Sequence, residues 1–170
     1  NTPYKFIATK AGVRLVEVVI ITRVNEIETE DCASISFAMT SGALATSSIT
    51  LGSATDETRL RFVFERLTAT SGTAPYAPGA EPWSFQARAP HRQAQLDAAL
   101  NTTPHEPIGF EGFFAQIALD LAGHENQAVT FEDGATSVAL VTAIYHSART
   151  GRRVELPLDP SHELYKGWLP

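Results

Sequence analysis

Residues 12–25 read GVRLVEVVIITRVN. Valine, isoleucine and other apolar residues dominate this stretch, and β-branched side chains fit the pleated surface of a strand better than a helix. We therefore predict a β-strand from about Val13 to Val24. Its two faces differ little in polarity, which indicates that both are covered.

The residues that follow predict further antiparallel strands. Apolar and small polar side chains alternate from Cys32 to Met39, which is the period of a strand with one apolar face. Ser41-Gly42 fits a hairpin turn, because glycine tolerates a positive φ. We expect the returning strand at about Ala43–Leu51, and the meander continues with another at about Arg59–Glu65.

Residues 71–90 differ in character from the strands before them. Four prolines and two glycines surround Tyr76, Trp83 and Phe85. Proline lacks an amide donor and fixes φ, so we predict an ordered excursion that is neither strand nor helix. Tyr76 and Trp83 either line a polyol pocket by stacking or cover the edge of a sheet.

The rest of the chain predicts helices. Residues 92–100 are a short candidate, and the apolar residues between Phe110 and Leu121 recur at helical spacing before Gly123, a glycine suited to end a helix.

A last helix is expected after Thr130, which stands in capping-box spacing with Asp133, and it should stop at Gly151 before a brief edge strand at Val154–Leu156. Strands followed by helices predict an α+β fold. We expect a mostly antiparallel open sheet with helices packed on one face and the other face available for dimerisation.

Length and composition restrict the classes of protein. A chain of 170 residues with 44% hydrophobic and 19% charged residues is expected to form a single domain. The net charge of -6 repels phosphate backbones, so nucleic acid is not an expected partner. The longest apolar run, Val18–Ile21, is too short to span a membrane. The first residues also lack the layout of a signal peptide, and we expect a cytoplasmic protein.

No motif marks a catalytic or cofactor site. Gly-x-Gly-x-x-Gly, the P-loop lysine motif and the Gly-x-Ser-x-Gly elbow are all missing from the sequence. The five histidines are at least fourteen positions apart, so no two share a helix face as metal ligands would. We therefore predict no catalytic, cofactor-binding or metal-binding residue in this chain.

Two sets of reactive side chains have a plain structural interpretation. Cys32 is expected to be a small packed thiol, since a nucleophile would need a base that the sequence does not reveal. Four acidic residues close together are expected to form a charged turn, with a functional carboxylate cluster as the alternative. They are Glu26, Glu28, Glu30 and Asp31.

Two longer stretches carry a family resemblance. Residues 129–134 read VTFEDG and residues 140–157 read LVTAIYHSARTGRRVELP, while residues 27–33 read IETEDCA before Phe37 and the Ser41–Leu44 hairpin. These stretches resemble the closing helix and strand, and an earlier strand and hairpin, of the Gfo/Idh/MocA oxidoreductases, the glucose-fructose oxidoreductase and inositol dehydrogenase family. The resemblance covers about Gly12 to Trp168, and the proline-rich excursion matches only a subset of these proteins.

The resemblance implies a two-domain parent enzyme. Its amino-terminal Rossmann domain would bind NAD(H) or NADP(H), and its carboxy-terminal α+β domain would wall the sugar or polyol site and often build the dimer. This chain resembles only the second domain, and its start at Asn1 fits a domain taken from a longer dehydrogenase. The family's catalytic lysine lies in a Glu-Lys-Pro motif and its Asp and His in a glycine-rich Asp-x-x-x-His motif, and we assign no residue here to either.

Two residues are candidates for the substrate wall. The guanidinium of Arg23 can donate several hydrogen bonds to hydroxyl or carboxylate oxygens, and the alternative is a salt bridge to the neighbouring acidic turn. His105, between Pro104 and Pro107, either contacts a ligand or is a loop histidine without a role.

We therefore predict the carboxy-terminal substrate-binding and dimerisation domain of an NAD(P)-dependent sugar or polyol dehydrogenase, inactive alone. The alternative is a stand-alone, non-enzymatic α+β module that dimerises through its open sheet face. A run of small and apolar residues would suit contact between sheets in that case. It consists of Ala43, Ala45, Ser47, Ile49 and Leu51.

Overall fold

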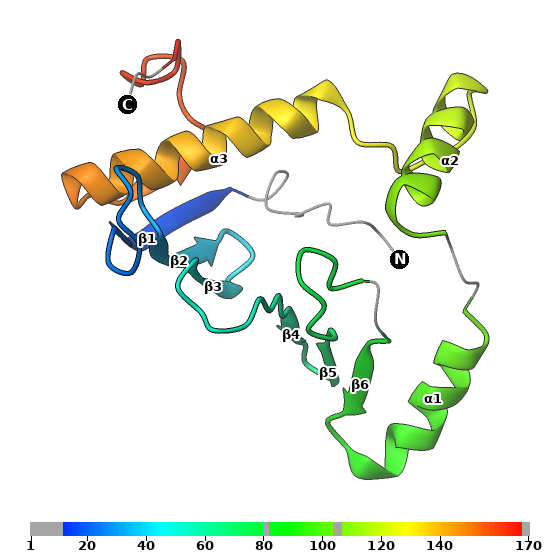
Figure 1. Ribbon diagram of the computed structural model, residues 1–170. Coiled ribbons are helices and arrows are strands. Elements are labelled where there is room, and N and C mark those ends of the chain that lie inside the picture. Colours follow the sequence, from blue (N-terminus) through cyan, green and yellow to red (C-terminus); the bar gives the residue numbers. More distant parts are fainter. Residues whose placement is uncertain (1–11, 80–81, 104–106, 168–170) are drawn as a thin grey trace. The chain divides into compact units, whose positions relative to one another are not determined.

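The computed structural model describes residues 12–79, 82–103 and 107–167, which form two compact units (Figure 1). One unit contains residues 54–128, and the other contains the segments that end at Ser53 and begin at Val129. Each unit has a sheet of its own. The single domain expected from chain length stays a prediction.

The first sheet has four strands in the order β3-β2-β1-β7, and all neighbouring pairs are antiparallel. The strands are β1 (Val13–Ile21), β2 (Cys32–Met39), β3 (Leu44–Thr50) and β7 (Val154–Leu156). Helix α3 (Phe131–Thr150) packs against β1 and β7. The predicted hairpin joins β2 to β3 at Gly42, whose φ is 87°, and β7 lies at the edge of the sheet as expected.

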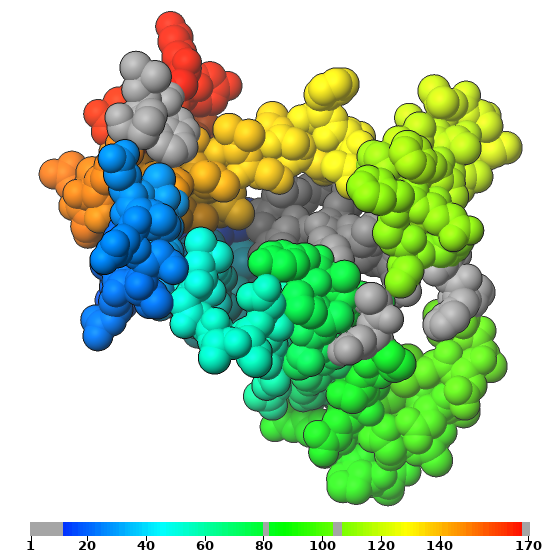
Figure 2. All heavy atoms as spheres, in the orientation of Figure 1, coloured from blue at the N-terminus to red at the C-terminus, as the bar shows by residue number. Residues whose placement is uncertain are grey.

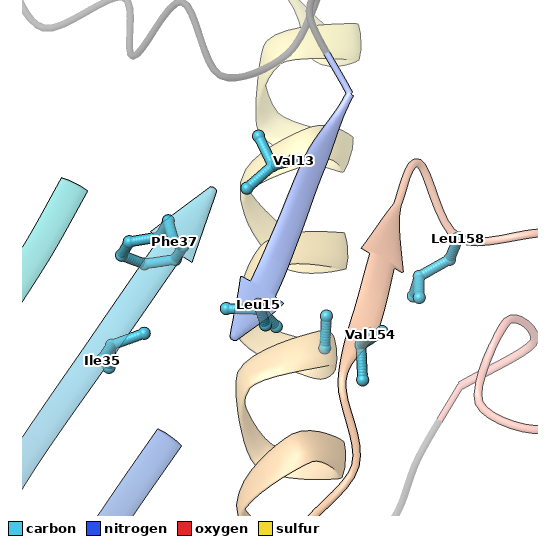
Figure 3. Packing of buried hydrophobic residues seen from close by; sticks show 7 residues of the cluster. Val13, Leu15, Ile35, Phe37, Val154 and Leu158 are labelled. Atoms are coloured by element: carbon cyan, nitrogen blue, oxygen red, sulfur yellow. The ribbon is translucent and has the colours of Figure 1, made fainter. Parts of the chain in front are cut away.

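The core of this unit lies between the sheet and α3. Leu15 on β1 and Ala143 on α3 are fully buried. Figure 3 shows the side chains of β1, β2 and β7 gathered beside the helix. The buried cluster consists of Val13, Leu15, Ile35, Phe37, Ala143, Val154 and Leu158.

A β-bulge changes the face that β1 presents. The register with β2 shifts between Leu15 and Glu17, so the extra residue moves the later apolar positions by one. Val18 therefore packs against the core, while Val19 and Ile21 are 46% and 42% exposed. Within the described residues of this single chain, the outer face of β1 is therefore exposed after the bulge, and the coverage of both faces of the strand stays a prediction.

Helix α3 has both of the predicted ends. The Thr130 hydroxyl accepts from the Asp133 amide at 3.3 Å, and the Asp133 carboxylate accepts from the Thr130 amide at 2.8 Å, which completes a capping box. Gly151 ends the helix in the left-handed conformation with φ of 63°.

The second sheet has three antiparallel strands in the order β4-β5-β6. They are β4 (Arg61–Val63), β5 (Leu67–Thr70) and β6 (Ser84–Ala87). The continuous meander is therefore wrong, because β4 pairs with β5 and not with β3. The prediction of no strand in residues 71–90 is also wrong, since the prolines at 82 and 90 flank β6 without interrupting its ladder.

Two helices follow β6 in this unit. Helix α1 (Gln93–Asn101) comes after a short 3₁₀ turn, Pro90–Arg92, and helix α2 (Gly109–Leu121) ends before Gly123 as predicted. Part of the apolar stripe of α2 is exposed, since Phe110 is 80% and Phe114 62% exposed. Figure 2 shows the yellow-green atoms of this helix at the surface.

The chain thus has the predicted α+β fold, with antiparallel sheets and α3 on one face of the four-stranded sheet. Among its described helices, none combines the length and the apolar character needed to cross a membrane.

Candidate functional site

The loop between β1 and β2 is built around the buried side chain of Asp31. Its carboxylate accepts backbone N–H groups from Arg23 at 2.9 Å, Val24 at 2.8 Å and Asn25 at 2.7 Å. The Asn25 side-chain amide donates to the same carboxylate at 3.2 Å. Three consecutive amides are therefore oriented toward one anion, and the loop backbone is held in one conformation.

These bonds determine the charge state of Asp31. The backbone amide of Asn25 contributes most to lowering the pKa of the carboxyl, burial opposes it, and the amides of Arg23 and Val24 add to the lowering. The pKa lies well below its ordinary value of 3.8. Asp31 is consequently a charged structural acceptor and does not serve as a general acid near neutral pH.

Arg23 lies two residues beyond the end of β1 and is exposed. Its backbone is tied to Asp31, while its guanidinium forms no ion pair with any residue in the described ranges. The salt bridge to the acidic turn is therefore not formed. The substrate-wall role of Arg23 stays a prediction, and His105 lies outside the described residues.

The acidic residues of the loop differ in their surroundings. The Tyr145 hydroxyl of α3 donates to the carboxylate of Glu30, and Glu26 and Glu28 are exposed. The described residues contain no group of three or more His, Cys, Asp or Glu side chains able to hold a metal ion. The interpretation as a charged turn is preferred, because one carboxylate anchors the loop and another anchors the loop to α3.

The outer face of the four-stranded sheet, opposite α3, is lined by small polar side chains. The Cys32 thiol is half-buried and lies 3.3 Å from the Thr50 hydroxyl. This contact fits the interpretation of Cys32 as a packed thiol. The pairs across the strands on this face are Cys32–Thr50, Ser34–Ser48 and Ser36–Thr46.

The residues expected to suit contact between sheets are on the wrong face for it. Ala45 pairs with Phe37 and packs against the core cluster. Ser47 and Ile49 share its face, because side chains alternate along a strand. The residues of β3 on the open face are instead Leu44, Thr46, Ser48 and Thr50.

The aromatic residues of the proline-rich segment have different surroundings. Trp83 stacks on Phe62 and Phe85 with ring centroids 5.9 Å and 6.5 Å apart, so it covers the three-stranded sheet. Tyr76 has a φ of 59° and is 85% exposed. The structure thus favours the sheet-covering interpretation of Trp83, and the two residues do not form one stacking pocket in the described structure.

Two features escaped the sequence analysis. The His146 imidazole lies 3.3 Å from the Glu163 carboxylate, and its ring meets the edge of the His162 ring with the two centroids 4.8 Å apart. These contacts join α3 to the segment after β7. Asp120 and His124 also have the bare Asp-x-x-x-His spacing of the family motif.

That spacing has a local structural role. The Asp120 carboxylate accepts from the Asn126 side chain at 2.8 Å, and the His124 backbone amide donates to Leu119 at the end of α2. These contacts stabilise the C-terminal end of α2, and this local role explains the Asp-x-x-x-His spacing. The described strands pair only antiparallel and offer no βαβ unit for a dinucleotide.

The similarity to known proteins comes from solved structures. No protein-family model and no curated protein matches the sequence. The WlbA dehydrogenase of Chromobacterium violaceum, in complex with NADH and UDP-GlcNAcA, is similar to 86% of this chain at 25% identity and a TM-score of 0.64. The predicted resemblance to Gfo/Idh/MocA-type dehydrogenases is confirmed.

Two further Gfo/Idh/MocA-type structures share the fold. One is the WlbA dehydrogenase of Bordetella pertussis in complex with NADH and UDP-GlcNAcA, at 24% identity and a TM-score of 0.64. The other is the aldose-aldose oxidoreductase of Caulobacter crescentus complexed with glycerol, at 20% identity and a TM-score of 0.60. Each match covers 86% of this chain and 41% of the other. The present chain therefore spans less than half the length of these dehydrogenases.

Proposed function

We propose that this chain is the carboxy-terminal, substrate-binding and dimerisation domain of an NAD(P)-dependent sugar or polyol dehydrogenase. The observation that carries the proposal is the fold match to 41% of a dehydrogenase that was crystallised with NADH and a nucleotide sugar. The lack of a dinucleotide fingerprint in the sequence agrees with it, because the cofactor would then be held by another part of the parent protein.

In this proposal the domain orients the substrate and the cofactor performs the hydride chemistry. A rigid scaffold can hold hydrogen-bonding groups in the orientation that the reaction needs. Arg23 is our substrate-wall residue here, because Asp31 fixes its backbone while its guanidinium is exposed. We assign His105 to the same wall.

Dimerisation is assigned to the outer face of the four-stranded sheet. Small hydroxyl side chains on β2 and β3 leave room for a second sheet at the usual spacing of about 10 Å. Exposed apolar groups on the same face, Val19 and Ile21, would be buried by the second copy. A two-fold symmetric contact of this kind is the commonest arrangement in soluble homodimers.

The test compares two proteins. We expect the reading frame upstream of Asn1 to encode a dinucleotide-binding motif. The purified 170-residue chain should give no NAD(P)-dependent oxidation of sugars or polyols, whereas the product of such a longer frame should give it. Turnover by the 170-residue chain alone would refute the proposal. A start codon immediately before Asn1 would favour the stand-alone module.

A further inference from the structure

Two arginines, Arg66 and Arg88, lie opposite each other in the backbone just beyond the paired ends of β5 and β6. The Arg88 amide donates to the Arg66 carbonyl at 2.8 Å, directly beyond the last paired rung of β5 and β6. Like charges at opposite positions destabilise a sheet. A bound anion would relieve such repulsion between the two arginines.

No described carboxylate neutralises this pair. Elsewhere Arg14 is paired with Glu155 at 2.8 Å and Arg59 with Glu57 at 2.9 Å. Arg66 and Arg88 form no ion pair with any residue in the described ranges, and the Arg88 guanidinium donates only to a backbone carbonyl, that of Glu65, at 3.4 Å.

Two more basic residues follow Arg88 within four positions. His91 and Arg92 lie in the 3₁₀ turn after β6, are exposed, and precede a helix whose first turn has no acidic residue. Arg92 contacts the neutral Gln95 amide oxygen at 3.3 Å. We call Arg66, Arg88, His91 and Arg92 the arginine corner.

The backbone of the arginine corner is fixed by one side chain. Gln93 accepts the Ala87 amide at 2.8 Å and donates to the Phe85 carbonyl at 3.0 Å, so the start of α1 is tied to β6. Gln93 also donates to Asp97 at 2.8 Å. The acidic residues closest to the corner in the sequence are Glu65, whose carboxylate forms no ion pair within the described ranges, and Asp97, which accepts from the Gln93 amide.

We propose that the arginine corner binds the phosphate group of a phosphorylated or nucleotide-linked sugar. The inference rests on the proposed function, because it specifies the class of sugar that the domain would recognise. Opposite residues in an antiparallel pair have Cβ atoms about 5 Å apart, so two guanidinium groups can bind oxygens of one phosphate or diphosphate. A cluster of positive charge on a chain of net charge -6 also selects anionic over neutral sugars.

Titration calorimetry on the 170-residue chain tests this inference with three probes: glucose 1-phosphate, UDP-glucose and glucose. We expect one or both phosphate-bearing probes to bind, more weakly as NaCl is raised, and glucose not to bind. The double variant Arg66→Ala/Arg88→Ala should weaken binding at least about tenfold, since each charge-assisted hydrogen bond contributes about that factor. Tighter binding of UDP-glucose than of glucose 1-phosphate would identify a nucleotide-linked sugar.

The matched control is Arg59→Ala, which removes an exposed arginine that is paired with Glu57 in the same unit. It should leave binding unchanged. Arg66→Lys/Arg88→Lys keeps the charge but loses the planar fork, so its affinity should be intermediate. Thermal melts followed by circular dichroism confirm that the variants are folded.

The inference is overturned if neither phosphate-bearing probe binds, if glucose binds as well as they do, or if Arg59→Ala weakens binding as much as the double variant. Its failure is separate from failure of the proposed function, because it is read from binding to this chain and not from dehydrogenase turnover.

Discussion

Truncation of Leu15 is the sharpest test of the core. Leu15 is fully buried, pairs with Phe37 across the sheet, and belongs to the cluster that includes the fully buried Ala143 of α3. Leu15→Ala removes three buried carbons at about 0.8 kcal/mol each, which gives about 2.4 kcal/mol of lost transfer free energy. The cavity left behind raises the expected loss of unfolding free energy to about 3–5 kcal/mol.

Urea denaturation followed by circular dichroism measures this loss. We expect the midpoint to fall while the dependence of the free energy on urea stays the same. The matched control is Val19→Ala on the same strand, beyond the bulge and 46% exposed. It should cost less than about 1 kcal/mol, because nearly half of this residue is exposed to water in the single chain.

A loss below about 1 kcal/mol for Leu15→Ala would refute the reasoning. So would an equal loss for the two variants, since it would mean that the bulge does not place the two residues on different faces. Either result would contradict the described register between β1 and β2.

Three further predictions concern the loop, the helix end and the dimer. Asp31 has a pKa below its ordinary 3.8 in the folded state, so its stabilising effect is present above about pH 4 and is lost as the pH falls below it. The difference in melting temperature between the unmodified chain and Asp31→Ala should therefore be smaller at pH 3 than at pH 7, and a constant difference would contradict the assignment. Thr130→Ala removes the hydroxyl half of the capping box and should lower the unfolding free energy by about 1 kcal/mol in urea titrations, whereas Ser137→Ala, at an exposed position of the same helix, should not lower it. Ser36→Arg places a long charged side chain on the outer sheet face and should convert a dimer to a monomer in light scattering, whereas a monomeric unmodified chain at high concentration would count against dimerisation through that face.

The sequence by itself determined the elements that depend on local spacing. The alternation in Cys32–Met39, the turn at Gly42 and the capping box at Thr130 each involve residues within a few positions of one another. They were predicted correctly for that reason, and the order of strands and helices was sufficient for the α+β class. The family resemblance also came from continuous stretches, and the solved structures bear it out.

The tertiary structure decided the features that join distant residues. The bulge near Val16 depends on the register with β2, and this register determines which apolar residues of β1 are buried. The pairing of β4 is an exception, because its partner β5 follows it after three residues and was not predicted as a strand. The carboxylate of Asp31 is an anchor only because the loop brings three amides to it.

The candidate sites follow the same division. Arg23 was identified from its residue type and position, but the absence of its salt bridge within the described residues needed the folded loop. The arginine corner was not predicted, because Arg66 and Arg88 are twenty-two positions apart and become neighbours only when β5 pairs with β6. Local propensities act through a few consecutive residues, whereas strand pairing and burial depend on the whole chain, and this difference separates what could be predicted from what had to be seen.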